Sequence, residues 1–366
     1  MTTIQTPRDL YDLLAERVID QQVALEQISV TLFKHVKRLK IGNILLIGNS
    51  GTGKTTIMRA IEQVFGSDAD LAQFTNTIRL NANVVADEQS ANVEASVILD
   101  RLRQNAMRIM GNTPTEARFR DLMENGVVFL DEVDKIRAIV GDKANPRGIL
   151  AQEALLTLIE GESVLLSYTG RDETGNAVPA ETHIRTAGIL FICGGAFEGL
   201  YDMVYRRVAS GEHRDKLVSE YVVAEDQQDL AEKEFFSLHD YVRYEDLFAY
   251  GMTPQFLGRF DEIIVLNDLT VQGMMRIFLE PSDSVFREAR RYFHSLGIDL
   301  QITKEALRLL AERARENHRL GARALRSVFK RVMRGIEFDP RESYLLQQQN
   351  GKKVLLINRD VVANLA

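Results

Sequence analysis

The segment Gly48-Asn49-Ser50-Gly51-Thr52-Gly53-Lys54-Thr55 constrains the fold of this chain more than any other. It fits the pattern G-x-x-x-x-G-K-[ST], in which the glycines let a loop turn its backbone N–H groups toward phosphate oxygens. A short apolar run at 41–47 precedes it, and apolar residues at helical spacing follow over 55–65. A buried strand, a glycine-rich turn and a helix open a parallel α/β domain. The segment therefore predicts a nucleotide-binding site.

Each residue type in this loop has a chemical reason to be there. We expect Lys54 to reach the β and γ phosphates of ATP and the Thr55 hydroxyl to bind Mg²⁺. Gly48, Asn49, Ser50, Gly51, Thr52, Gly53 and Thr56 complete the predicted nucleotide-binding set. The positive end of the helix dipole that starts near Thr55 adds to the attraction for phosphate.

Two adjacent acids follow a second buried run, Val127-Val128-Phe129-Leu130. In a P-loop protein a carboxylate at the end of such a strand lies beside the metal and the γ-phosphate. We expect Asp131 to hold Mg²⁺ and Glu132 to deprotonate the attacking water as general base. Adjacent acids at a strand end are otherwise common as a solvated turn or a helix cap.

The rest of the chain predicts an α/β domain with a parallel sheet covered by helices, followed by a small, mostly helical lid domain. A third buried run lies at 189–192, helical patterns lie at 8–38, 93–110 and 149–160, and 200–250 reads as an insertion without a buried strand. After 266 the helical patterns are 270–279, 282–296, 303–317 and 321–336, with a β-like stretch at 353–357. The predicted domains are therefore 1–266 and 267–366.

Composition narrows the classes of protein that this chain can belong to. A net charge of −7 gives no support to a general nucleic-acid binder, and no apolar run approaches the ~20 residues of a membrane helix. The single cysteine, Cys193, can form neither an internal disulfide nor a cysteine-rich zinc site. With no signal-peptide core at the N-terminus, the expected compartment is the cytoplasm.

Several long strings, read together, resemble the ClpX family of AAA+ protein unfoldases. They include Leu130-Asp131-Glu132-Val133-Asp134-Lys135-Ile136, Leu158-Ile159-Glu160-Gly161 and Ile189-Leu190-Phe191-Ile192-Cys193-Gly194-Gly195-Ala196-Phe197. The resemblance runs from Thr6 to about Gly335. It implies a homo-oligomeric, hexameric ring that hydrolyses ATP with Mg²⁺ and unfolds protein substrates.

The resemblance also implies roles that spacing alone does not show. Val18 and Ile19 match the adenine-pocket segment, although Asp20 stands where the family has glycine. Arg259, in Pro254-Gln255-Phe256-Leu257-Gly258-Arg259-Phe260, matches the arginine finger that acts on a neighbouring subunit. Arg323, in Gly321-Ala322-Arg323, matches the sensor-2 residue that contacts its own subunit's nucleotide. Taken alone, either arginine reads more simply as a surface ion-pair residue.

The sequence departs from the family in the parts that contact other proteins. The four-cysteine zinc domain and the Ile-Gly-Phe tripeptide that docks on the ClpP protease have no counterpart, and 200–250 holds the acidic stretch Glu225-Asp226-Gln227-Gln228-Asp229 instead. The outline of the substrate-gripping pore loop falls at Asn83-Val84-Val85-Ala86-Asp87-Glu88, where Val84 replaces the aromatic residue and Val84 and Val85 are expected to line the channel. Coupling to a ClpP-type protease is therefore not expected.

Three readings of the function stay open at this point. The first is a ring ATPase that remodels an unidentified protein substrate or adaptor-bound partner without feeding ClpP. The second is a non-translocating ATP switch or scaffold, which the altered pore loop favours. The third is an AAA+ loader acting on nucleic acid, against which the net charge and the ClpX-like strings argue.

Overall fold

The computed structural model of the chain describes residues 4–39, 42–85, 95–111, 114–141, 143–171, 176–210, 218–223, 230–235, 238–316, 320–341, 343, 345–349 and 351–365. These residues form two compact units. The first unit holds 1–17, 23–48 and 54–266, and the second holds 18–22, 49–53 and 267–366. The second unit thus takes in most of the glycine-rich loop as well as the C-terminal part of the chain.

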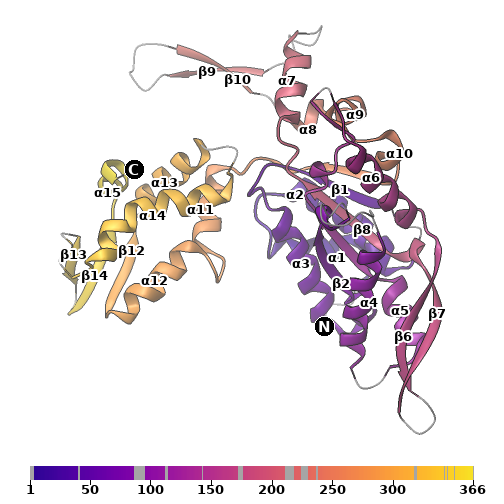
Figure 1. Cartoon of the computed structure of the whole chain (residues 1–366). Coiled ribbons are helices and arrows are strands. Elements are labelled where there is room, and N and C mark those ends of the chain that lie inside the picture. The colour runs from indigo at the N-terminus through magenta and orange to yellow at the C-terminus, as the bar shows by residue number, and fades with distance from the viewer. Residues whose placement is uncertain are drawn as a thin grey trace. The chain divides into compact units, whose positions relative to one another are not determined.

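A five-stranded parallel sheet forms the centre of the first unit (Figure 1). Its strands, in the order β11-β1-β8-β3-β2, are Phe260–Val265, Asn43–Ile47, Leu190–Gly195, Val127–Asp131 and Thr77–Asn81. The three central strands are almost entirely apolar and buried, because a parallel sheet is covered on both faces. The prediction of an α/β fold with a parallel sheet is confirmed.

Helices lie on both faces of this sheet. The helices of the first unit are α1 (Pro7–Ala15), α2 (Gln22–Val36), α3 (Lys54–Ser67), α4 (Ser96–Met110), α5 (Glu116–Glu124), α6 (Pro146–Ile159), α7 (Leu200–Ser210), α8 (Leu238–Tyr241), α9 (Tyr244–Tyr250) and α10 (Pro254–Leu257). Leu102 of α4 and Phe119 of α5 pack with Val128 and Leu130 of β3, whereas Phe129 points to the face that α3 covers. Successive side chains of a strand point to opposite faces, which explains this division.

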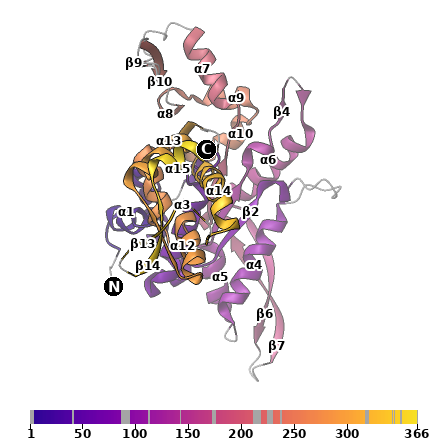
Figure 2. The ribbon, with the colours of Figure 1, turned by 90° about the vertical axis from the view of Figure 1, so that its left-hand side faces the viewer.

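Short elements complete the first unit. They are the 3₁₀ turns η1 (Ala69–Phe74), η2 (Ala82–Val84), η3 (Val133–Lys135) and η4 (Thr186–Gly188), and the strands β4 (Ile139–Val140), β5 (Lys143–Ala144), β6 (Ser163–Arg171), β7 (Ala177–Arg185), β9 (Val218–Val223) and β10 (Leu230–Phe235). Strands β6 and β7 pair as a long antiparallel hairpin that extends beyond α4 and α5 (Figures 1 and 2). Strands β9 and β10 pair in the same way. The 200–250 stretch thus contains strands as well as helices, which its sequence did not predict.

The second unit is mostly helical but carries a small sheet. Its helices are α11 (Val271–Leu279), α12 (Val285–Ser295), α13 (Lys304–Glu316), α14 (Ala322–Phe338) and α15 (Arg359–Leu365), and its strands are β12 (Ile298–Ile302), β13 (Leu346–Gln349) and β14 (Lys352–Ile357). Strand β14 lies between β12 and β13, parallel to the first and antiparallel to the second. The predicted helices match α11 to α14, and the β-like stretch is β14.

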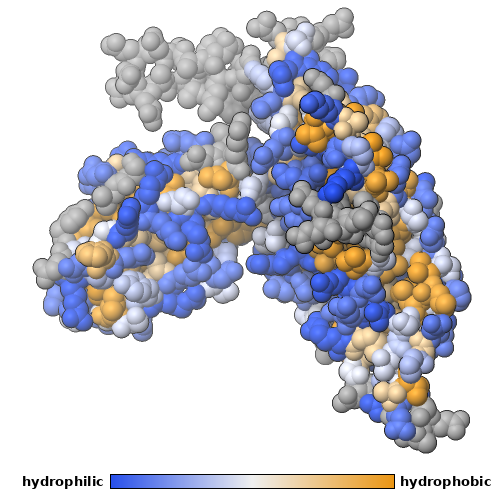
Figure 3. Space-filling model, in the orientation of Figure 1, coloured by the Kyte–Doolittle hydropathy of each residue, from blue (hydrophilic) through white to orange (hydrophobic). Residues whose placement is uncertain are grey.

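Figure 3 shows one face, on which hydrophilic and hydrophobic side chains are interspersed. None of the helices in the part of the chain that the structure describes is both long enough and apolar enough to span a bilayer. The lone thiol, Cys193 in the middle of β8, has no exposed surface, and burial raises its pKa.

Candidate nucleotide-binding site

The glycine-rich loop joins the end of β1 to the start of α3, as the sequence predicts. Gly51 and Gly53 have φ angles of +78° and +114°, which L-residues with a Cβ rarely adopt. In the first unit Lys54 begins α3 and is nearly buried, and its Nζ donates a hydrogen bond to the carbonyl oxygen of Gly48. Thr55 and Thr56 follow in the first turn of the helix. Two glycines of the predicted phosphate-binding loop thus take backbone conformations that favour glycine.

Asp131 lies at the carboxyl end of β3, close to Lys54. The neighbouring strand β8 places Gly194 between them: a Cβ on Gly194 would lie 3.6 Å from Lys54 Cδ and 3.7 Å from Asp131 Oδ1. The two predicted site residues thus flank one glycine, whose missing side chain leaves them room. Sequence reasoning had not singled out Gly194.

Glu132, the predicted general base, has an unusual backbone. Its φ of 60° and ψ of 35° place it in the left-handed region, although it is not glycine. Its N–H donates to Asp131 Oδ1 at 3.0 Å, and its Oε2 accepts a hydrogen bond from Asn81 Nδ2 at 2.5 Å. Strained backbone of this kind concentrates at functional sites, where the surrounding contacts hold it in place.

Asn81 is a site residue that sequence reasoning missed. It ends β2, and the parallel register of β2 and β3 sets it opposite Asp131. Its side-chain amide therefore reaches across the carboxyl edge of the sheet to the carboxylate of Glu132. The signal was available, since a polar residue that ends one strand of a parallel sheet faces the residues that end its neighbour.

Arg259 lies at the amino end of the parallel sheet, whereas the glycine-rich loop follows the carboxyl end of β1. It precedes β11, whose first residue Phe260 pairs with Asn43 at the start of β1, and Asn43 Nδ2 donates to the Arg259 carbonyl at 3.1 Å. Four residue steps of β1, roughly 13 Å, separate Asn43 from Ile47 beside the loop. The Arg259 guanidinium forms an ion pair with Glu160 just after α6. The structure therefore does not bring Arg259 to the loop of its own chain.

The second unit brings together three other predicted segments. Arg323 Nη1 donates to Ser50 Oγ at 2.7 Å, and the N–H of Ala322 donates to the Gly51 carbonyl at 3.2 Å. Gln21 Nε2 donates to the carbonyl of Thr52 at 3.0 Å, so the segment that contains Val18 and Ile19 lies against the loop as well. The start of α14 and the 18–22 segment thus meet at 49–53.

Asp20 adopts the backbone conformation that a glycine would have there. Its φ is 69°, and its Oδ2 accepts hydrogen bonds from the N–H and Oγ1 of Thr270 at 2.8 and 2.6 Å. Aspartate tolerates the left-handed region better than most residues, and these two bonds hold it there. The departure from the family's glycine therefore preserves the local turn.

The prediction that Val84 and Val85 both line the channel is wrong for Val85. Val85 is only 1% exposed and packs in the core of the first unit, so its side chain cannot contact a threaded chain. Val84 is exposed, at the end of η2. Residues 86–88 of the outlined loop lie outside the described residues, as does the acidic stretch 225–229.

A buried polar group lies behind the Asp131-Glu132 pair. Burial raises the pKa of Asp134, while Lys135 and the backbone N–H groups of Phe197 and Ala196 lower it. Burial of Tyr250, together with the nearby charge of Asp134, raises the pKa of the Tyr250 hydroxyl to about 12. Asp134 packs closely against Gly195 of β8, where a Cβ would lie only 2.6 Å from the Asp134 Oδ1.

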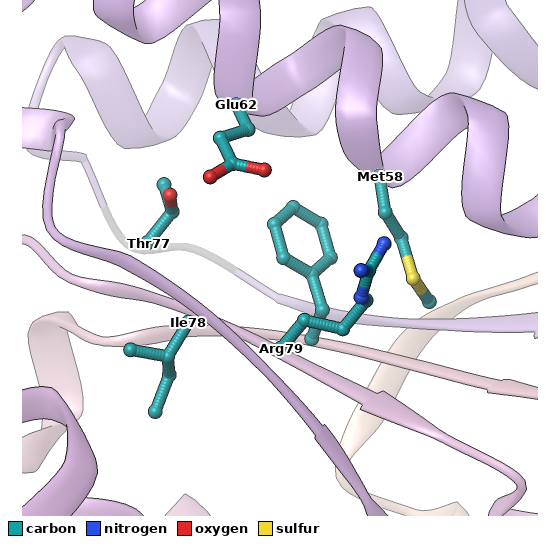
Figure 4. Close-up of a pocket in the computed structure, with 6 residues that line it drawn as sticks. Met58, Glu62, Thr77, Ile78 and Arg79 are labelled. Carbon is teal, nitrogen blue, oxygen red and sulfur yellow. The ribbon is translucent and has the colours of Figure 1, made fainter.

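A small cavity lies at the edge of the sheet beside this site (Figure 4). Met58 and Glu62 of α3 face Thr77 and Arg79 of β2 across it. Phe129 of β3 also lines it. Its volume of about 130 Å³ is well below the ~300 Å³ at which ordinary ligand pockets begin. It is too small for a nucleotide and is separate from the glycine-rich loop.

The donor set fits a magnesium nucleotide. No cluster of three or more His, Cys, Asp or Glu side chains among the described residues could hold a metal alone. Mg²⁺ at a P-loop does not need one, because a hydroxyl, one carboxylate, phosphate oxygens and water complete its shell. Thr55 and Asp131 are the groups of this type that the structure offers.

Comparison with known proteins agrees with this geometry. Residues 39–263 match the model of the AAA domain (Cdc48 subfamily). The chain is 29% identical over 377 positions to an ATP-dependent Clp protease ATP-binding subunit ClpX of Treponema denticola, covering 99% of this chain and 82% of that protein. It is 30% identical over 381 positions to ClpX 3 of Methylococcus capsulatus, covering 98% and 80%. The chain belongs to the ClpX-like AAA+ ATPases. It is an ATPase whose α/β domain binds nucleotide.

Proposed function

We propose that this ClpX-like ATPase forms a ring, expected to be hexameric, that uses ATP hydrolysis to remodel or unfold a protein partner. The position of Arg259 carries the proposal of a ring. Arg259 lies at the amino end of the parallel sheet, whereas its own loop follows the carboxyl end of β1, and this supports a role at the nucleotide of another subunit. An arginine supplied from a neighbour is a common source of rate in P-loop enzymes.

The proposed chemistry is hydrolysis of the γ-phosphoryl group of ATP. Lys54 binds the β and γ phosphates, while Val18 and Ile19 contact the adenine and Arg323 senses the nucleotide of its own chain. A water molecule attacks the γ-phosphorus, its proton passes to the Glu132 carboxylate, and the bond to the bridging oxygen breaks to give ADP and phosphate. Thr55 and Asp131 would hold Mg²⁺, which neutralises charge on the phosphates.

The short bond from Asn81 gives Glu132 a defined orientation for this step. The left-handed backbone of Glu132 adds to this fixed geometry. Asn81 is therefore the residue that we assign to positioning the base.

We further propose that the ring does not deliver its partner to a ClpP-type protease. The similar proteins are named as ATP-binding subunits of the Clp protease. In this chain, 200–250 lacks the Ile-Gly-Phe tripeptide on which the family docks. Incubation with a ClpP-type protease and a labelled model substrate tests this directly, and ATP-dependent degradation would contradict the proposal.

The second candidate, a non-translocating ATP switch, is favoured by one observation. Val85 is buried, so at most Val84 of the predicted pair can contact a threaded chain, and its side chain is aliphatic. An aliphatic side chain offers less contact area than the tyrosine of the family. This candidate predicts ATP-dependent assembly without unfolding of any partner.

One experiment separates the candidates. Glu132→Gln should bind ATP without hydrolysing it, because an amide cannot accept the proton of water, and it should therefore retain its partner. Proteins captured by this variant in ATP are identified and then tested with the unmodified chain for stimulated ATPase and loss of structure. Unfolding of the captured protein supports remodelling, and capture without unfolding supports the switch. A DNA-dependent rise in ATPase would support a loader instead.

A further inference from the structure

The buried side chain of Gln152 joins two segments that the chemistry uses. Gln152 lies in α6 and is 1% exposed. Its Nε2 donates to the carbonyls of Ile136 at 2.8 Å and Gly251 at 3.3 Å. Its Oε1 accepts from the N–H and the Oγ1 of Thr253 at 2.8 and 2.9 Å. Both donor hydrogens and both acceptor sites of the amide are thus used.

One of these segments follows the proposed base Glu132 in the chain, and the other precedes the proposed arginine finger Arg259. Ile136 comes four residues after Glu132, at the end of η3. Thr253 caps α10 by accepting from the N–H of Phe256 at 3.4 Å, and α10 leads through Gly258 to Arg259. The two segments also bond directly, since the N–H of Ala138 donates to the Gly251 carbonyl at 2.7 Å. A movement of the turn after Glu132 therefore reaches the start of α10 through this backbone bond and through the Gln152 side chain.

The far end of α6 holds Arg259 itself. Glu160 comes eight residues after Gln152, about 12 Å along the helix axis, and its carboxylate forms the ion pair with the Arg259 guanidinium. Helix α6 thus holds the finger segment at two points, by Gln152 at Thr253 and by Glu160 at Arg259. Burial of the first contact makes it costly to break, since an unpaired buried amide loses its hydrogen bonds to water and protein alike.

We propose that Gln152 and Glu160 are positioning residues for Arg259. Through α6 they couple the turn after Glu132 in one subunit to the arginine that this subunit offers to its neighbour. The proposal rests on the proposed function, in which Arg259 acts in trans. It assigns the communication between successive nucleotide sites to a side-chain network inside each subunit.

Mixed rings test this coupling with two kinds of subunit. A Glu132→Gln subunit offers a finger but has no base, and an Arg259→Ala subunit has a base but no finger. ATP hydrolysis by the mixture therefore measures how well Arg259 of the Glu132→Gln subunits acts at the nucleotide sites of the Arg259→Ala subunits. Assembly of the mixture is confirmed by size before each assay.

The decisive change is Gln152→Leu placed only in the Glu132→Gln subunit. That subunit performs no chemistry, so a lower rate can arise only through the finger that it supplies. We expect hydrolysis by the mixture to fall about tenfold, which corresponds to about 1.4 kcal/mol of transition-state stabilisation. Nucleotide binding by the altered subunit should not change. An unchanged rate would overturn the proposal.

Three further variants test the proposal if Gln152→Leu does not fold. Thr253→Val removes one of the four bonds of Gln152 together with the cap of α10. Placed in the Glu132→Gln subunit, it should lower the rate about threefold. Glu160→Ala in the Glu132→Gln subunit should also lower the hydrolysis rate of the mixture. Glu160→Gln keeps a hydrogen-bond acceptor without the charge, so it should restore part of that rate. Equal rates for Glu160→Ala and the reference mixture would overturn the role of Glu160.

Glu116→Ala is the matched control. Glu116 forms an ion pair with Arg120 in α5, with side chains 52% and 46% exposed, against 40% and 47% for Glu160 and Arg259. It should leave the mixture unaffected. If the reference mixture itself shows no hydrolysis while the unmodified chain hydrolyses ATP, the trans assignment of Arg259 falls, and this proposal with it, but the ATPase assignment stands.

Discussion

Lowering the pH should destabilise the first unit through one buried histidine, His35. It lies in α2 with its ring centroid 5.0 Å from that of Phe74 and 6.4 Å from that of Phe65 in α3. Its Nε2 is 3.1 Å from the carbonyl oxygen of Asn125. Burial lowers the pKa of His35 from 6.5 to about 4, and the Asn125 carbonyl opposes part of that shift. The folded protein therefore holds this imidazole neutral.

The sign of the effect follows from where the proton binds. Below pH 6.5 the unfolded chain takes up a proton on His35 that the folded chain refuses until about pH 4, so stability falls as the pH falls through this window. At about 1.36 kcal/mol for each pH unit, the complete loss is about 3 kcal/mol. Between pH 7.5 and pH 5 the loss is about 2 kcal/mol.

Urea unfolding followed by circular dichroism at pH 7.5 and pH 5 measures this loss. Carboxylates also titrate in this range, so the relevant quantity is the difference between the unmodified chain and His35→Gln, whose amide keeps a donor toward Asn125 but does not titrate. The unmodified chain should lose about 2 kcal/mol more than the variant. Equal losses, or an NMR titration that gives His35 an apparent pKa near 6.5, would refute the reasoning.

Four substitutions test the nucleotide site and the predicted channel residues. Lys54→Ala should abolish binding of a fluorescent ATP analogue, because it removes the cation that we assign to the β and γ phosphates, and retained binding would contradict that role. Asn81→Ala should lower kcat about tenfold with little change in KM, since the base loses its orientation; an unchanged kcat would show that the amide does not position Glu132. Val84→Asp should leave basal ATPase unchanged and weaken partner-stimulated activity, because a threaded chain would have to desolvate the charge, whereas Val85→Asp should unfold the domain. Full partner stimulation with Val84→Asp would remove the support for threading.

Sequence reasoning found the elements whose residues are buried on both faces. The runs that form β1, β3 and β8 are almost continuously apolar. Asp131 and Glu132 could be singled out because they stand at the end of such a run. Strand β2 was missed because it lies at the edge of the sheet, where half-buried Thr77 and Asn81 and exposed Arg79 interrupt the apolar pattern. Asn81, whose amide donates to the carboxylate of the proposed base Glu132, was missed together with β2.

Other features depended on contacts between residues far apart in the chain. Hairpin β6–β7 alternates in burial, a period of two that was present in the sequence but was not used. Nothing local marks Val85 as buried, since Val84 beside it is exposed. The bonds of Gln152 join segments up to 101 residues apart, so no pattern along the chain could have indicated them.

The burial of Cys193 makes the chain a ready template for site-specific labelling. A maleimide reacts with a thiolate that it can reach, and this sulfur is enclosed in the central sheet with its ionisation disfavoured. Any cysteine introduced on the surface would then be the single reactive one without removal of the native residue. Pairs of dyes or spin labels at Val84 and at exposed Phe338 could report distances between subunits while the protein hydrolyses ATP.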